Sequence, residues 1–490
     1  MAMRKRTLAA SLMLCLLPLG AQMAPRAAPP GALSRLAGEI IVGGRAYNYD
    51  RELADGIGPR LTGSANYRRA VAWAVAQFRA LGLSDVHREP WTIPDTWQPD
   101  GPATARLLAP HQQFLHLVSE GWSPSTPPGG VRGKVVYLAD VRPAAVRAAA
   151  GAIAGAIVLV DEASLAPGFA AGQGALFDGI RRIGEEGARG LLFGLGVRNG
   201  ASNMFGDTGF TGTVANLPAG NLGLEDTLLL KRLLAAGEAP VVAFSFHNRI
   251  RPRVTVNNVV AEIPGRDRGA GYVLVAAHLD SWQAGTGAQD DGTGVASVLA
   301  IARAIQAAGL RPRRTIRFVL FGGEEEGLLG SRAYVRRHRA GLGRCAAVLI
   351  TDNGGGAPSG WFTMHRAGED RALAAIAPAL DALGAGQTYG GHDFVFSADS
   401  APFVAAGVPC FLLSAPMGPY LRIHHQPGDT FDKVNQRDLG ISAAVVGVTT
   451  FALADMPARL PRLAPAAVAA QLKALGLLTQ YDDMKAHGIF

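Results

Sequence analysis

Acidic and histidine side chains recur just after apolar runs in the second half of the chain. They fall in five segments: AAHLDSW (276–282), GAQDDGTG (287–294), GGEEEGLLGS (322–331), ITDNGG (350–355) and IHHQPGDT (423–430). Taken singly, each has an ordinary structural explanation, such as a hydrogen-bonded histidine at a strand end, a helix cap or solvated glutamates. Together they would crowd carboxylates into one crevice, which is costly unless cations neutralise them.

The donor types indicate which cation. A mixture of His, Asp and Glu without thiolates suits zinc, with manganese or cobalt as substitutes. Five ligands that include one bridging carboxylate would hold two ions, and such a pair suits the activation of water for attack on a carbonyl.

The elements that must position these segments alternate between strand and helix. Strands are predicted at VNNVVAEI (256–263), YVLVAAHLD (272–280), TIRFVLF (315–321) and AAVLITDN (346–353), with a helix over 294–307. This alternation predicts an α/β fold: a mixed, mostly parallel central sheet flanked by helices. The chemistry-bearing residues then follow the carboxyl ends of strands, where open α/β sheets bind ligands.

The five segments, in this order, resemble the metallopeptidases of family M28, most closely the branch that includes plasma glutamate carboxypeptidase. GPRLTGS (58–64) and the helix predicted over 65–83 are also similar to that branch, and the resemblance spans roughly residues 45–455. It implies a zinc-exopeptidase fold with two Zn2+ ions per chain. The implied ligands are His278, Asp290, Glu325, Asp352 and His425.

The resemblance also implies roles. Asp290 would bridge the two ions, and Glu324 would be the general base. A one-residue slip within the run of three glutamates is the main alternative, although the GLLGS that follows favours this register. One ion would be held by His278, Asp290 and Asp352 and the other by Asp290, Glu325 and His425, a grouping that the sequence leaves open.

Two neighbouring residues are assigned supporting roles. Asp280 would accept the second ring N–H of His278 and set its tautomer. His424 would either donate to the developing oxyanion or simply lie beside the site.

The chain divides into five predicted regions. Residues 1–24 are a signal peptide, 31–108 begin the peptidase domain, 109–246 form an insert, 247–460 complete the peptidase domain, and 461–490 form a helical tail. The insert holds short β-like runs separated by glycine-rich turns and no cluster of metal ligands. It resembles the smaller β/α protease-associated domain that this branch carries.

The signal peptide predicts export. Arg4, Lys5 and Arg6 precede an apolar stretch over 8–19, which is too short for a stable membrane span. We therefore expect a periplasmic or secreted protein. After cleavage the cysteines Cys345 and Cys410 remain, either as buried thiols or as a disulfide.

Composition excludes some classes of protein. The 490 residues are 48% hydrophobic and 18% charged, which indicates a folded core rather than disorder. The net charge of +8 comes from scattered basic residues, so no nucleic acid partner is expected.

The sequence thus predicts an exported di-zinc exopeptidase that acts on peptides with a free N-terminus or on dipeptides. Carboxypeptidase specificity, a non-catalytic receptor-like homologue and a single-zinc acyltransferase are the alternatives. The complete ligand set opposes a dead homologue, and the paired-ion set opposes the acyltransferase. A homodimer is possible by resemblance alone.

Overall fold

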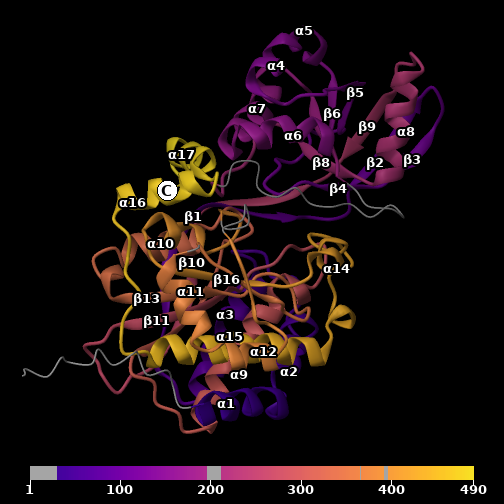
Figure 1. Ribbon diagram of the computed structural model, residues 1–490. Helices are drawn as coiled ribbons and strands as arrows, with labels where there is room; N and C mark the ends of the chain where they lie inside the picture. Colours follow the sequence, from indigo (N-terminus) through magenta and orange to yellow (C-terminus); the bar gives the residue numbers. More distant parts are fainter. Residues whose placement is uncertain (1–29, 196–210, 365, 391–395, 490) are drawn as a thin grey trace, which may run out of the picture.

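The computed structural model describes residues 30–195, 211–364, 366–390 and 396–489. They form two bodies, each built on an eight-stranded sheet, and Figure 1 shows one body above the other. The predicted signal peptide, residues 1–24, lies outside the described residues.

The larger sheet contains eight strands: β1 (Ser84–Pro99), β10 (Asn248–Ile263), β11 (Tyr272–His278), β12 (Thr315–Phe321), β13 (Cys345–Ile350), β14 (Gly360–Phe362), β15 (Gln387–Tyr389) and β16 (Cys410–Ser414). Their order is β1-β10-β12-β11-β13-β16-β14-β15. The four central strands β12, β11, β13 and β16 run parallel, while β10 and β14 flank them in antiparallel pairing. The predicted mixed, mostly parallel sheet is therefore confirmed.

Helices cover both faces of this sheet. One face carries α1 (Pro30–Gly43), α2 (Ala46–Ala54), α3 (Ala65–Ala80), α9 (Thr293–Ala307), α11 (Ala367–Ala374), α12 (Ala377–Ala382) and α15 (Gln436–Asp455). The other face carries α10 (Leu329–Arg337), α13 (Ala401–Ala405), α16 (Pro465–Ala474) and α17 (Leu478–Ala486).

The helix predicted over 65–83 illustrates how local sequence sets the boundaries. The Ser64 side chain caps α3 by accepting a hydrogen bond from the Tyr67 N–H. The helix ends at Ala80, and Gly82 follows with φ of 72°, a left-handed conformation that glycine adopts without strain.

Strand β11 shows why the central strands are apolar throughout. Val273, Val275 and Ala277 belong to the core beneath one face, whereas Leu274 and Ala276 belong to the core on the other. A strand covered on both sides must be apolar at every position, in contrast to the alternation of a half-exposed strand.

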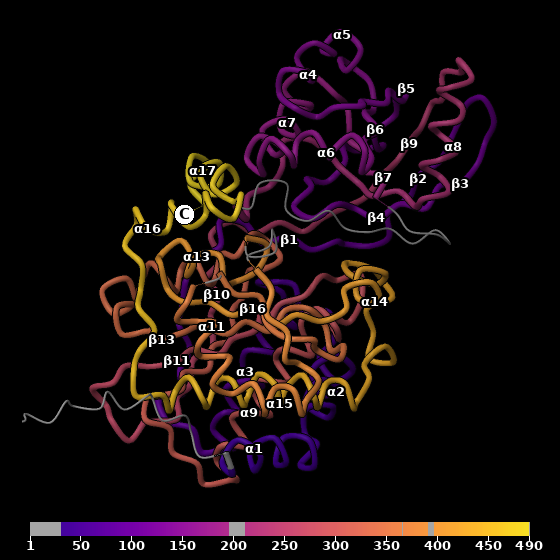
Figure 2. The backbone as a smooth tube through the Cα atoms, viewed as in Figure 1, coloured from indigo at the N-terminus to yellow at the C-terminus, as the bar shows by residue number. Residues whose placement is uncertain are grey.

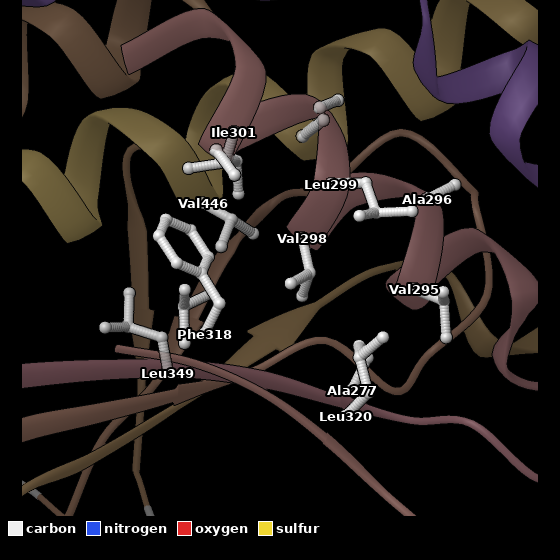
Figure 3. Close-up of a cluster of buried hydrophobic side chains, with 14 of the residues drawn as sticks. Ala277, Val295, Ala296, Val298, Leu299, Ile301, Phe318, Leu320, Leu349 and Val446 are labelled. Atoms are coloured by element: carbon white, nitrogen blue, oxygen red, sulfur yellow. The ribbon is translucent and has the colours of Figure 1, made fainter. Parts of the chain in front are cut away.

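The first of these cores is drawn in Figure 3. Val298 and Ile301 of α9 point toward Phe318 on β12 and Leu349 on β13, the strands on either side of β11. Val446 of α15 belongs to the same cluster. All five side chains are buried. This packing fixes α9, and α9 in turn starts immediately after the loop that carries Asp290.

The smaller sheet has the order β3-β2-β9-β5-β6-β7-β8-β4. Its strands are β2 (Thr104–Ala109), β3 (Gln113–Leu115), β4 (Leu117–Ser119), β5 (Val131–Tyr137), β6 (Ile157–Asp161), β7 (Gly190–Gly194), β8 (Ala219–Leu222) and β9 (Val241–Ser245). Its helices are α4 (Pro143–Ala148), α5 (Ala150–Ile153), α6 (Glu162–Ala171), α7 (Gln173–Glu185) and α8 (Leu224–Ala235). We call this body, residues 104–245, the insert.

The bodies are joined by several contacts, of which two involve whole elements of secondary structure. Strands β1 and β10 pair antiparallel from the larger sheet up to Pro99 and Asn248, next to the insert (Figure 2). Helix α17 also contacts the insert, where the Asp483 carboxylate accepts a hydrogen bond of 2.6 Å from the Gly174 N–H.

Helix α15 is long and apolar enough to cross a membrane, but 78% of its apolar window is buried within the protein. It packs against α1 and α9 as a core helix (Figure 1). Cys345 and Cys410, on β13 and β16, are buried free thiols.

Candidate metal centre

The five predicted ligands follow four neighbouring parallel strands. His278 is the last residue of β11, Glu325 lies just beyond β12, Asp352 just beyond β13, and His425 follows β16 and the short helix α14 (Met417–Leu421). Asp290 lies in the loop between β11 and α9. Parallel strands present their carboxyl ends at one edge, so residues far apart in sequence meet there.

Three of these side chains form one group. His278 Nε2 lies 3.0 Å from Asp290 Oδ1 and 3.5 Å from Asp352 Oδ1. Their donor atoms all lie within 4.8 Å of one another, a spacing that a single metal ion can span.

A second group shares Asp290. His425 Nε2 lies 3.0 Å from Glu325 Oε2 and 3.5 Å from Asp290 Oδ2. His424 Nε2 is also 3.4 Å from Asp290 Oδ2. The two oxygens of Asp290 therefore face different groups, which is the arrangement a bridging carboxylate requires.

The chemistry of this donor set fits divalent metal ions. His278, Asp290 and Glu325 are almost fully buried, and the Oδ2 atom of Asp290 has no hydrogen-bond partner among the described residues. A buried carboxylate oxygen left without a partner is costly. Cations bound between the two groups would satisfy it.

Electrostatics within the site reflect crowding of like charges. Burial and then the charge of Asp290 raise the pKa of Glu325 to about 7. Burial raises the pKa of Asp290 as well, but the hydrogen bond from His278 and the neighbouring histidines outweigh it and hold that pKa below its ordinary value. Burial, with the adjacent His425, lowers the pKa of His424 to about 3. His424 is thus a neutral side chain at pH 7.

Two carboxylates that the sequence did not single out for a role hold the Asp290 loop. Asp429 accepts hydrogen bonds from the Gln289 N–H at 2.7 Å and the Asp290 N–H at 3.2 Å. Asp291 accepts from the His278 N–H at 3.2 Å and the Gly294 N–H at 3.0 Å. Both lie in the recognised segments, but only the folded backbone shows which amides they meet.

The three residues with predicted supporting or catalytic roles also lie here. Asp280 Oδ1 is 3.8 Å from His278 Nδ1, longer than a hydrogen bond. Asp280 instead faces the backbone N–H of Glu325 at 3.4 Å. Glu324 is half-buried and lines the same cavity as His424. Burial raises the pKa of Glu324 well above its ordinary value.

A cavity of about 270 Å³ opens beside the ligands. Its lining combines the acidic and histidine side chains with large apolar ones: Leu328, Phe396, Leu412, Met417, Tyr420 and Leu421. None of its described lining residues is lysine or arginine.

Comparison with known proteins agrees with this geometry. Residues 258–450 match the model of peptidase family M28. Carboxypeptidase Q of Bos taurus is 30% identical over 435 residues, which cover 86% of this chain and 89% of that protein. The chain belongs to peptidase family M28. The predicted family is thereby confirmed, and with it a hydrolase that acts on peptides.

Solved structures of M28 members and similar enzymes share the fold. The M28 peptidase precursor of Shewanella amazonensis superposes with a TM-score of 0.77 at 30% identity, covering 89% of this chain and 99% of that chain. A zinc aminopeptidase from Bacillus subtilis superposes with a TM-score of 0.62 at 21% identity, covering 83% of this chain and 94% of that chain. The latter likeness concerns the fold alone.

Proposed function

We propose that this chain is an exported exopeptidase that holds two zinc ions and removes residues from peptides with a free N-terminus or cleaves dipeptides. The observation that carries the proposal is the shared carboxylate. Asp290 lies within reach of His278 and Asp352 through one oxygen and faces His425 through the other. In this proposal His278, Asp290 and Asp352 hold one ion, and Asp290, Glu325 and His425 hold the other.

The protein's own residues supply the proton transfers. When bound, the zinc ions would polarise the scissile carbonyl and make water more acidic. Glu324 takes a proton from the attacking water at its carboxylate and delivers it to the departing amine nitrogen. A raised pKa strengthens the affinity of the Glu324 carboxylate for that proton. His424, neutral at pH 7, donates a ring N–H toward the developing oxyanion.

The lining of the cavity supports action at an amino end. A carboxypeptidase needs a cation to hold the terminal carboxylate, and the described lining offers no lysine or arginine. The apolar lining residues of the cavity would contact an apolar first side chain.

The relatives from Bos taurus and Homo sapiens are named carboxypeptidase Q, so carboxypeptidase specificity is the second candidate. The test is zinc content together with hydrolysis of a panel of free, N-acetylated and C-amidated dipeptides, before and after chelation. We expect two zinc equivalents, activity lost on chelation and restored by zinc, and no cleavage of acetylated substrates. Cleavage of acetylated but not amidated peptides would establish the second candidate.

The remaining predictions extend this proposal. The signal peptide implies a periplasmic or secreted location, which fractionation of expressing cells would test. A homodimer and the protease-associated character of residues 109–246 rest on the family resemblance, and light scattering would test the dimer.

A further inference from the structure

Three tryptophan side chains form a column between the two bodies. Trp97 stacks on Trp122 with ring centroids 6.1 Å apart, and Trp122 meets Trp282 edge-to-face at 6.1 Å. All three are buried and belong to the core of the larger sheet. Trp97 lies near the upper end of β1, while Trp122 follows β4 of the insert. The insert thus contributes a side chain to the peptidase core.

The lower end of the column contacts the metal centre. The Trp282 ring packs edge-to-face against His425 at 5.8 Å, and the backbone N–H of Trp282 donates to Glu325 Oε1 at 3.2 Å. These are two of the three ligands proposed for one ion. The indole Nε1 of Trp282 has no hydrogen-bond partner among the described residues, so only packing fixes this ring.

The upper end of the tryptophan column is held by hydrogen bonds to the insert and to strand β1. The Trp122 indole donates to the Asp95 carbonyl of β1 at 2.9 Å, and the Trp122 carbonyl accepts from the Ala215 N–H at 2.8 Å. The Trp97 indole donates to the Ser123 carbonyl at 2.9 Å. Trp122 itself has φ of 53°, a strained left-handed conformation for a non-glycine residue. These contacts determine where the Trp122 ring packs against Trp282.

We propose that Trp122 and Trp282 are positioning residues that couple the placement of the insert to the ligands His425 and Glu325. His425 also has a left-handed backbone, with φ of 59°, a conformation that the surrounding structure must hold. Removal of Trp122 lets Trp282 tilt into the vacated space, and the ring of His425 loses one of its packing contacts while its stacking on His424 at 3.6 Å remains. This inference rests on the proposed di-zinc function.

If Trp122 had a purely structural role, its truncation would lower stability without any specific effect on a metal ligand. Trp361 on β14 offers the comparison, because it is equally buried and belongs to the same core, where it packs edge-to-face on Phe411 at 6.2 Å. It is not in ring contact with the column. Truncation of either tryptophan removes buried apolar area and lowers stability. Only truncation of Trp122 should disturb a metal ligand.

The experiment measures zinc affinity of the full-length chain by competition with a chelator, for wild type, Trp122→Leu and Trp361→Leu. Loss of a residue that orients a ligand typically weakens metal binding about 10–100-fold. We expect this shift for one of the two zinc equivalents in Trp122→Leu and no shift in Trp361→Leu, with comparable decreases in melting temperature. Trp122→Phe, which keeps a smaller aromatic ring, should give a smaller shift and replaces the leucine variant if that does not fold.

Zinc affinity equal to wild type in the Trp122 variants would refute the coupling. Equal weakening in Trp361→Leu would refute it too, because the effect would then be a general loss of stability. A wild-type chain that binds fewer than two zinc equivalents would instead overturn the proposed function, so the two failures are distinguishable.

Discussion

Substitution of Glu324 by glutamine should abolish turnover while leaving the protein folded and metal-loaded. Loss of a general base typically lowers kcat about 10²–10⁴-fold, or roughly 3–5 kcal/mol of transition-state stabilisation. Stability should not fall, because burial and nearby carboxylates already disfavour the charged form of Glu324. Glutamine keeps the shape and removes that charge. Initial rates on a free dipeptide, zinc content and a thermal melt measure the three quantities.

Glu325→Gln is the matched control for Glu324→Gln, because the two residues are adjacent in the run of three glutamates. Glu325 faces His425 at 3.0 Å, so its loss should release one zinc equivalent together with activity. If Glu325→Gln instead kept zinc but lost turnover, and Glu324→Gln kept both, the roles would be shifted by one residue, to Glu325 as base and Glu326 as ligand. A rate within a few-fold of wild type for Glu324→Gln would refute the base assignment outright.

Three further outcomes are expected. Asp290→Ala should lose both zinc equivalents, whereas His425→Ala should lose one. Elemental analysis of the purified chains would measure both losses. Equal losses in the two variants would exclude a bridging role for Asp290. Phe318→Ala should lower the free energy of unfolding by about 3–5 kcal/mol in urea titrations, because the side chain is fully buried in the core of Figure 3. Burial raises the pKa of Glu369 to about 7, so its contribution to stability is complete below pH ~4.5 and is lost as the pH rises through 7. Glu369→Gln should therefore show a smaller decrease in urea midpoint than wild type between pH 5 and pH 8.

The central strands and the clustering of the candidate ligands could be predicted because their signals are local. An apolar run such as 272–278 is typical of a strand buried on both faces, and acids directly after such runs point to the carboxyl edge of the sheet. The resemblance to a known family then gave each acid a role. The structure brings the five predicted ligands together, as the order of the strands requires.

Other features depend on contacts that no local pattern reveals. Asp429 was visible as part of a motif, but its two hydrogen bonds to the loop of Asp290 arise only from folding. Trp122 lies in a segment without any candidate site residue, and its place in the core of the larger sheet comes from long-range packing against Trp282. Arg60 is fully buried and donates to the carbonyls of Leu279 and Gly287, each more than 200 residues away in the sequence. Such contacts are set by topology rather than by spacing.

The pairing of β1 with β10 also implies an order of folding. Pro99 pairs with Asn248, so every residue of the insert must be synthesised before this end of the β1–β10 pair can form. Closing an unfolded loop of this length costs roughly 4 kcal/mol of chain entropy. An insert that has already collapsed around its own cores brings the two ends together and removes most of that cost. We therefore expect the insert to fold first and the interrupted peptidase sheet to assemble around it.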